Sequence, residues 1–133
     1  MFKTEIVYED FNGESRAEDF YFHMSTPEII RMEAEVGEDL EEHIRNLAKD
    51  GDAKTLLDFL EKIILGSYGK RTTDGKSFIK SVELRREFEY SNAYAELFER
   101  VLTDSEFTEK FAQSIVSTKK APREKFQPKV LDK

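Results

Sequence analysis

The sequence predicts an α+β protein, with an N-terminal β-hairpin packed on a bundle of five to six short helices and an irregular basic C-terminal tail. Three observations lead to this prediction. Apolar residues alternate over residues 2–9 and 16–24, a pattern typical of strands. From residue 25 to residue 117 they recur every three or four positions, as they do in helices. The final stretch holds two of the three prolines and a cluster of basic residues.

The two predicted strands are separated by Asn12-Gly13, a dipeptide that is a strong hairpin signal. A two-residue turn there would place Phe20 opposite a charged residue, so the apolar faces of the two strands would disagree. A three-residue loop that ends in a left-handed Gly13 instead pairs Phe20 with Thr4 and Phe22 with Phe2. We expect this second register. We also expect the ribbon to lie on helices, because two strands alone are marginally stable.

Helix start signals divide the rest of the chain into short helices. Ser25 and Glu28 have the spacing of a capping box, Pro27 suits a first helical turn, and Gly37 is expected to end the helix. Further helices are expected over "EDLEEHIRNLAKD", over "AKTLLDFLEKIILGSY" with Tyr68 in its apolar stripe, over "VELRREFEY" after Ser81, over "AYAELFERVLT" after Ser91 or Asn92, and over "EFTEKFAQSIV" after Asp104 or Ser105.

The stretch "GSYGKRTTDGKS", residues 66–77, shares the Gly-Lys-Ser ending of a phosphate-binding P-loop. A P-loop has four residues between its first glycine and this ending, whereas five residues follow Gly69 here. Asp74 would also place a negative charge where phosphates bind. We therefore predict a helix that stops at Gly66 or Gly69, a turn at Asp74-Gly75, and a return of the chain to the core at Phe78 and Ile79.

Charge is unevenly distributed along the chain. Six basic and two acidic residues give residues 119–133 a charge of +4, so at a net charge of −7 the other 118 residues carry −11. We expect residues 1–117 to form a single α+β domain and residues 118–133 a basic, largely disordered tail. An acidic body repels nucleic acid, so no nucleic-acid partner is expected. No apolar run approaches the roughly 20 residues of a membrane span, so no membrane partner is expected.

Residues that carry chemistry do not form a catalytic or metal-binding pattern. The chain has no Cys, which excludes disulfides and thiol catalysis. His23 and His43 are far apart in sequence and lack the spacing of a zinc motif. Seven acids within residues 28–42 lack the spacing of a calcium loop, and a solvated helical face is expected for them. Most serines lie at helix starts, where capping explains them. We therefore expect no enzyme, no catalytic residue, no metal and no cofactor.

Three stretches of the chain resemble the small tail assembly chaperones of long-tailed phages and prophages of Gram-positive bacteria. "YEDFNGESRAEDFYFHMSTPEIIRME" is similar to the opening of that family, and "AYAELFERVLTDSEFTEKFAQSIV" to its closing helical pair. "KIILGSYGKRTTDGKSFIKSVELRREF" is similar to its middle, and the residues in question are Ser67, Tyr68, Gly69, Asp74, Gly75, Lys76, Phe78, Ile79 and Lys80. The resemblance covers about residues 3–117, and the basic tail departs from it.

The resemblance implies a non-enzymatic role in the host bacterial cytoplasm. Such proteins bind the tape measure protein, a long helical chain that sets tail length, and keep it soluble until tail tube subunits assemble around it. A longer frameshifted form of such proteins engages the tail tube protein, some self-associate into rings or spirals, and they are absent from the mature virion. The alternative is another small phage structural or adaptor protein, such as a tail-completion or scaffold component.

Basic residues are the candidates for partner binding. Lys70, Arg71, Lys76 and Lys80 are candidates for contact with acids on a neighbouring copy, and the alternative for this loop is simple solvation. In the tail, the candidates for contact with the acidic body of another subunit are Lys119, Lys120, Arg123 and Lys125. The alternative for the tail is a terminus with no role beyond solubility.

Overall fold

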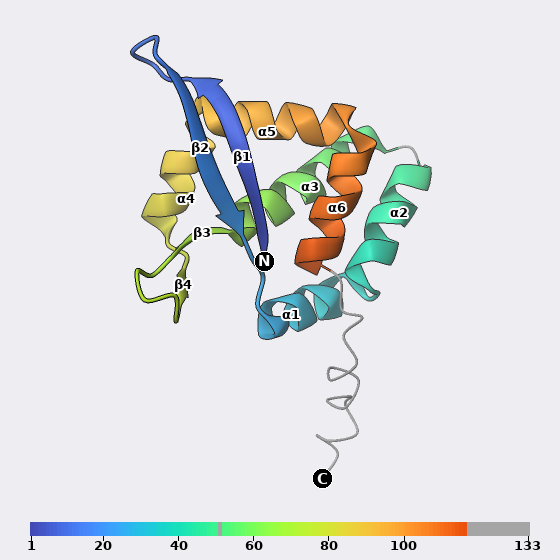
Figure 1. The fold of residues 1–133 in the computed structure, drawn as a ribbon. Coiled ribbons are helices and arrows are strands. Elements are labelled where there is room, and N and C mark those ends of the chain that lie inside the picture. The colour runs from blue at the N-terminus through green and yellow to red at the C-terminus, as the bar shows by residue number, and fades with distance from the viewer. Residues whose placement is uncertain (51, 117–133) are drawn as a thin grey trace.

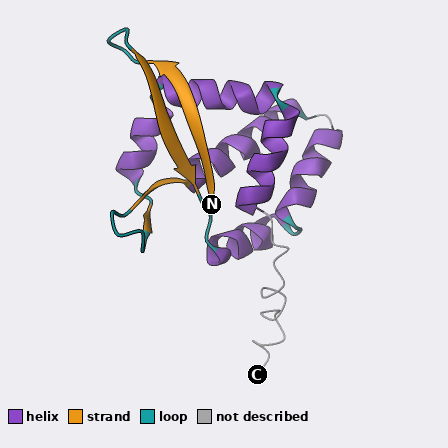
Figure 2. Cartoon of the chain, viewed as in Figure 1, coloured by secondary structure: helices purple, strands orange, loops and turns teal. Residues whose placement is uncertain are grey.

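A computed structural model describes residues 1–50 and 52–116 of the 133-residue chain. Within these residues the fold is α+β, with an N-terminal antiparallel hairpin and six helices, as predicted (Figure 1). The elements follow in the order β1 (Phe2–Glu9), β2 (Ser15–Phe22), α1 (Thr26–Val36), α2 (Leu40–Asp50), α3 (Ala53–Ser67), β3 (Tyr68–Arg71), β4 (Phe78–Ile79), α4 (Val82–Glu89), α5 (Asn92–Thr103) and α6 (Ser105–Val116). Figure 2 shows the strands in the left half of the view, with α4 on their left and the other helices behind them or on their right.

The first hairpin has the register that the apolar pattern predicts. Phe2 pairs with Phe22 and Thr4 pairs with Phe20. The Asp10 amide donates to the Glu14 carbonyl (2.8 Å), which closes a loop of three residues, and Gly13 has a φ of +83°. A side chain at this position would be strained, so the glycine permits the turn. The turn therefore brings the apolar residues of both strands onto one face.

That apolar face packs against the helices around Phe22, which is fully buried. Its ring lies 5.6–5.8 Å from the rings of Tyr68, Phe88 and Phe111. These three residues come from β3, α4 and α6, so one side chain joins the hairpin to three later elements. Ring pairs at these separations add to the free energy of burial. The core therefore lies between the ribbon and the helical layer.

The predicted helix starts are confirmed, and the structure decides between the alternatives. Ser25 and Glu28 form the reciprocal capping box, and Gly37 ends α1 in a left-handed conformation. Ser81 caps α4, and Ser91 rather than Asn92 caps α5. Asp104 rather than Ser105 accepts the Phe107 amide (3.1 Å) at the start of α6.

Two expectations for the middle of the chain were wrong. Tyr68 does not extend the stripe of α3, because the helix ends at Ser67 and Tyr68 begins β3. β3 and β4 form a second hairpin, and the four strands make one sheet in the order β1-β2-β3-β4. Ile79 does not return to the core, since 47% of it is exposed. The two-residue β4 is too short to leave an alternating pattern in the sequence.

The acids of residues 28–42 are more than a solvated helical face. The Glu33 carboxylate accepts the Leu40 amide (3.2 Å), and Asp39 accepts the amides of Glu41 and Glu42 (2.8 and 3.2 Å) at the start of α2. These carboxylates satisfy amide groups that have no partner within the helix. The predicted C-terminal tail, residues 118–133, lies outside the described residues.

Candidate functional site

The segment that resembles the family's middle forms the second hairpin, and its Asp-Gly turn is confirmed. Thr72 donates its amide to the Ser77 carbonyl (2.9 Å), and Gly75 turns the chain with a φ of +75°. The Asp74 carboxylate accepts the Thr72 hydroxyl (2.7 Å) and the Lys76 amide (3.0 Å). These bonds hold the pKa of Asp74 below its usual value. The turn amides are thus directed at protein groups, and a P-loop geometry is absent from this segment.

The Ser67, Tyr68 and Gly69 residues of the segment are all closely packed. Ser67 is fully buried and donates its hydroxyl to the Ile64 carbonyl (3.1 Å). The Tyr68 ring stacks on Phe88 at 4.4 Å. A Cβ on Gly69 would lie 2.5 Å from the carbonyl oxygen of Ile79, so only glycine lets β3 approach β4 this closely.

Lys80 connects the second hairpin to the rest of the protein. Its ammonium donates to the carbonyls of His23 and Gly66 (both 2.9 Å) and pairs with the Glu28 carboxylate (2.7 Å). Partial burial alone would raise the pKa of Glu28, but the bonds from Lys80 and Ser25 outweigh it and hold the pKa below its usual value. Because its donors are used inside the protein, we leave Lys80 out of the proposed partner surface.

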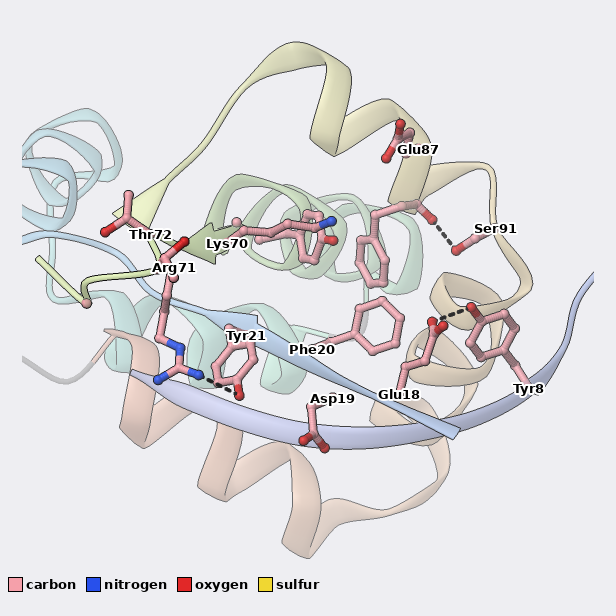
Figure 3. Close-up of a pocket in the computed structure, with 15 residues that line it drawn as sticks. Tyr8, Glu18, Asp19, Phe20, Tyr21, Lys70, Arg71, Thr72, Glu87 and Ser91 are labelled. Atoms are coloured by element: carbon pink, nitrogen blue, oxygen red, sulfur yellow. Dashed lines mark hydrogen bonds between the residues drawn. The ribbon is translucent and has the colours of Figure 1, made fainter. Parts of the chain in front are cut away.

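A cleft of about 600 Å³ opens between β2, β3 and α4 (Figure 3). Its lining includes the aromatic residues Phe20, Tyr68 and Phe88 and the carboxylates of Glu18 and Glu87. Burial, followed by the charges of these two carboxylates, raises the pKa of Tyr68. The cleft therefore combines aromatic rings with charges of both signs, because Lys70 and Arg71 line it as well.

Two of the predicted basic residues line this cleft. The Arg71 guanidinium lies 4.5 Å from the centre of the Tyr21 ring and donates to the Tyr21 hydroxyl (3.1 Å). Lys70 extends from β3 toward α4 (Figure 3). Lys76 is exposed at the hairpin turn, and the structure does not bring it to the cleft lining. The tail candidates Lys119, Lys120, Arg123 and Lys125 lie outside the described residues.

A second hollow, of about 510 Å³, is a groove between α2, α3 and α6, which the sequence did not predict. Half of its lining is aliphatic, contributed by Ile44, Ala48, Leu56, Leu60, Val101, Leu102 and Ala112. Leu102 is 50% exposed at the end of α5. Leu102 lies four residues after Phe98, so the helical spacing places the two side chains on the same face of α5. Only the tertiary fold, however, brings α2 and α6 together around it.

The two histidines have structural neighbours. His43 Nδ1 lies 2.7 Å from the Glu38 carboxylate, and its ring meets Phe59 edge-on at 4.8 Å. The His23 ring meets Phe78 edge-on at 5.8 Å. Among residues 1–50 and 52–116, no three His, Cys, Asp or Glu side chains are grouped so that they could hold a metal ion. None of the helices in this part of the chain combines the length and apolar character that crossing a membrane requires.

The comparison with protein families gives a match. Neither the curated proteins nor the solved structures contain a match to this chain. A family model described as phage tail assembly chaperone matches residues 1–125, which include both hairpins and all six helices described above. The match covers nearly the whole chain, and it agrees with the resemblance seen in three separate stretches of the sequence. The chain belongs to the phage tail assembly chaperone family.

Proposed function

We propose that this protein is a non-enzymatic chaperone that binds the tape measure protein and keeps it soluble while the tail tube assembles. Membership of the phage tail assembly chaperone family supports a role in tail assembly. The observation that carries the finer proposal is the groove between α2, α3 and α6, because its aliphatic lining is open at the surface of an acidic protein.

The groove suits one apolar face of an amphipathic helix. Walls made by helices, with aliphatic side chains between them, are a recurring way to receive such a helix. Leu102 stands half-exposed at one side, and Leu56 and Leu60 are partly buried at the base. Glu41, Arg45 and Glu109 also line the groove, so a client helix can place its polar flanks beside charges of both signs.

A long helical client explains why a soluble partner is needed. Apolar helix faces that lack a partner associate with each other, and covering them with a charged protein prevents this. The net charge of −7 keeps the complex dispersed in the host bacterial cytoplasm. Release of the client to the tail tube protein would then leave the chaperone outside the mature virion. Self-association and contact with the tail tube protein remain parts of the same proposal.

Co-expression tests this proposal. The partner is the long, helix-rich reading frame expected directly after the gene, and the measurement is the fraction of it that stays soluble and co-purifies. Leu102→Asp should weaken the complex roughly 30-fold, the loss of a central apolar contact worth about 2 kcal/mol. Val82→Asp is the matched control, since Val82 is 61% exposed and does not line the groove.

The outcomes separate the candidate functions. Loss of the soluble client with Leu102→Asp but not with Val82→Asp supports binding through the groove. If the wild-type protein neither raises the solubility of the long protein nor co-purifies with it, tape measure binding is wrong. Equal losses from both variants would mean that added charge on any helix disturbs the complex and that the groove is not the binding face.

A further inference from the structure

The outer edge of β2 is unpaired over most of its length. β2 pairs with β1 along all eight residues, but it pairs with β3 only at Tyr21 and Phe22. β3 then pairs with β4 instead. Within the described residues, no other strand pairs with residues 15–20 on that side. A strand edge of this kind presents backbone groups that can bind a further strand.

The β1–β2 ladder shows which backbone groups face this edge. The Asp10 amide donates to the Glu14 carbonyl (2.8 Å), so these two residues form a hydrogen-bonded pair. Such pairs alternate along antiparallel strands, so Ala17 and Asp19 direct their N–H and C=O groups away from β1. The His23 amide belongs to the same alternation, and it donates to a carbonyl at the end of α3 (2.8 Å). An added strand can therefore bond to β2 at two positions.

The cleft of about 600 Å³ lies along this same edge. Its lining takes in β2 from Glu18 to Tyr21, all of β3, and Glu87 of α4. The pairing of β2 with β3 stops where Tyr21 lies opposite Gly69. The cleft continues past this point along β2, so it occupies the place that a further strand paired with β2 would take.

The charges that line the cleft are separated by sign. Figure 3 shows Glu18 and Glu87 on the same side of the cleft as Tyr8, and Arg71 on the opposite side. Lys70 precedes Arg71 on β3 and extends from there toward α4. A segment of a single charge sign does not complement such a cleft. An occupant with a basic group at one end and an acidic group at the other does.

The alternation of side chains along a strand sets the order of these groups. Glu18 and Phe20 are two residues apart on β2, so they share a face. Tyr68 pairs with Phe22 and shares that face too, and its ring lies 6.2 Å from the ring of Phe20. On an added strand, the residue opposite Phe20 would meet these rings, and the residue opposite Glu18, two positions along, would meet the carboxylates. The residue two positions before the first would lie toward Lys70.

We propose that an extended segment of a partner protein adds to the open edge of β2 as an antiparallel strand. From its N-terminal end the segment carries an acidic, an aromatic and a basic residue at alternate positions. The acidic residue pairs with Lys70, the aromatic residue packs on Phe20, and the basic residue pairs with Glu18 and Glu87. The antiparallel direction follows β1 and β3, which both pair with β2 in this way. The site goes beyond the proposed function, because it shares no residue with the groove between α2, α3 and α6.

The test measures the fluorescence anisotropy of a labelled synthetic peptide as full-length protein is added. The probe is Asp-Thr-Phe-Thr-Lys-Thr with both ends blocked, so that no terminal charge contributes. Its control is the reverse sequence, Thr-Lys-Thr-Phe-Thr-Asp, which has the same composition and charge. In an antiparallel strand only the probe brings both charges beside groups of opposite sign. The probe should therefore bind roughly tenfold more tightly than its reverse, about threefold for each pair.

Methylation of single peptide amides tests the backbone bonds without changing the protein. In the probe, the threonine between Phe and Lys lies opposite Asp19, so its amide faces β2. The lysine lies opposite Glu18, so its amide faces away. N-methylation of that threonine should weaken binding roughly tenfold, and N-methylation of the lysine should weaken it much less.

Protein variants test the charge pairs. Glu87→Gln should weaken binding of the probe roughly threefold and leave unchanged the binding of a probe with Thr in place of Lys. Glu83→Gln is the matched control, because Glu83 is exposed on the same helix and does not line the cleft. Leu102→Asp should leave peptide binding unchanged, so the failure of this proposal and that of the proposed function are distinguishable.

Three results would overturn the proposal. If the probe shows no saturable binding up to about 1 mM protein, the cleft does not accept such a segment. Equal affinities for the probe and its reverse would remove the order of charges. Equal losses from the two N-methylated probes would show that the peptide does not bind as a strand.

Discussion

The two hairpins of this protein have similar turns but are held in place by different contacts. Both contain a glycine with a positive φ, +83° at Gly13 and +75° at Gly75. The first hairpin pairs eight residues on each strand, whereas β4 has only two residues. The first is held by a broad apolar face, and the second by Gly69, which allows close approach, and Lys80, which makes three bonds at a distance in sequence.

This difference shows that the two hairpins are stabilised by different kinds of contact. A ribbon whose apolar face packs on the helices holds its register without help at its outer edge. A hairpin with short strands needs contacts from elsewhere, and Lys80 supplies them at the start of α1 and the end of α3. We therefore expect the stability of the first hairpin to depend on burial and that of the second on the contacts of Lys80.

Removing the central aromatic residue of the first hairpin should have the largest effect. Phe22→Ala is expected to lower the free energy of unfolding by about 4 kcal/mol, because it leaves a cavity among three aromatic rings. Phe11→Ala is the control in the same hairpin, since Phe11 is 80% exposed at the tip. Chemical denaturation measures both. An effect of Phe22→Ala no larger than that of Phe11→Ala would contradict the role given to this face.

Adding one methyl group to the second hairpin should come next. Gly69→Ala is expected to cost about 3 kcal/mol, because the new Cβ meets the Ile79 backbone and must displace it. Gly66→Ala is the matched control, because a Cβ there meets nothing within 4 Å. Alanine in that helical position should stabilise the protein by about 1 kcal/mol. Opposite signs for two glycines three residues apart are the expected result in thermal melts.

Removing the Lys80 ammonium should destabilise the protein less than the steric clash of Gly69→Ala. Lys80→Met keeps most of the side-chain length and removes the ammonium, so it should cost about 2 kcal/mol through the lost bonds to Glu28 and two carbonyls. Lys76→Met is the control, an exposed lysine at the turn of the same hairpin. Urea denaturation distinguishes the two, and equal midpoints would show that Lys80 does not anchor the hairpin.

Substitutions at the turn glycines of the two hairpins should lower the stability of the protein by similar amounts. Gly13→Ala and Gly75→Ala each place an alanine in a left-handed conformation, so each should cost about 1 kcal/mol. A Cβ at either position meets nothing within 4 Å, so strain alone is measured. A much larger cost at Gly75 would mean that the second hairpin depends on its turn as well as on Lys80.

Acid should weaken the anchor by a still smaller amount. The pKa of Glu28 in the folded protein lies below its usual value of 4.5, so the stability it contributes is present above that pH and is lost as the pH falls below it. Glu28→Gln cannot titrate and should reduce the fall in melting temperature between about pH 5 and about pH 3. A fall in melting temperature as large in Glu28→Gln as in the wild-type protein would contradict this role for Glu28.

Much of the fold could be predicted from local patterns. The register of the first hairpin followed from requiring Phe20 and Phe22 to share a face with Phe2, and the capped helix starts followed from Ser25, Ser81 and Ser91. The second hairpin could not be predicted in this way, because β4 is too short for alternation and Tyr68 continues the helical spacing of α3. At the candidate site, the predicted basic residues Lys70 and Arg71 line the cleft. The sequence did not predict that the Lys80 ammonium binds groups within the protein itself.

The sequence by itself determined the class of the fold, the first hairpin and the capped helix starts, because each depends on residues within a few positions of one another. Only the tertiary structure decided that Lys80 binds the ends of α1 and α3, that β2 keeps an open edge beside an aromatic cleft, and that α2, α3 and α6 enclose an aliphatic groove. Each of these features joins residues far apart in the chain. Their contact depends on how the whole core packs, and no local pattern records it.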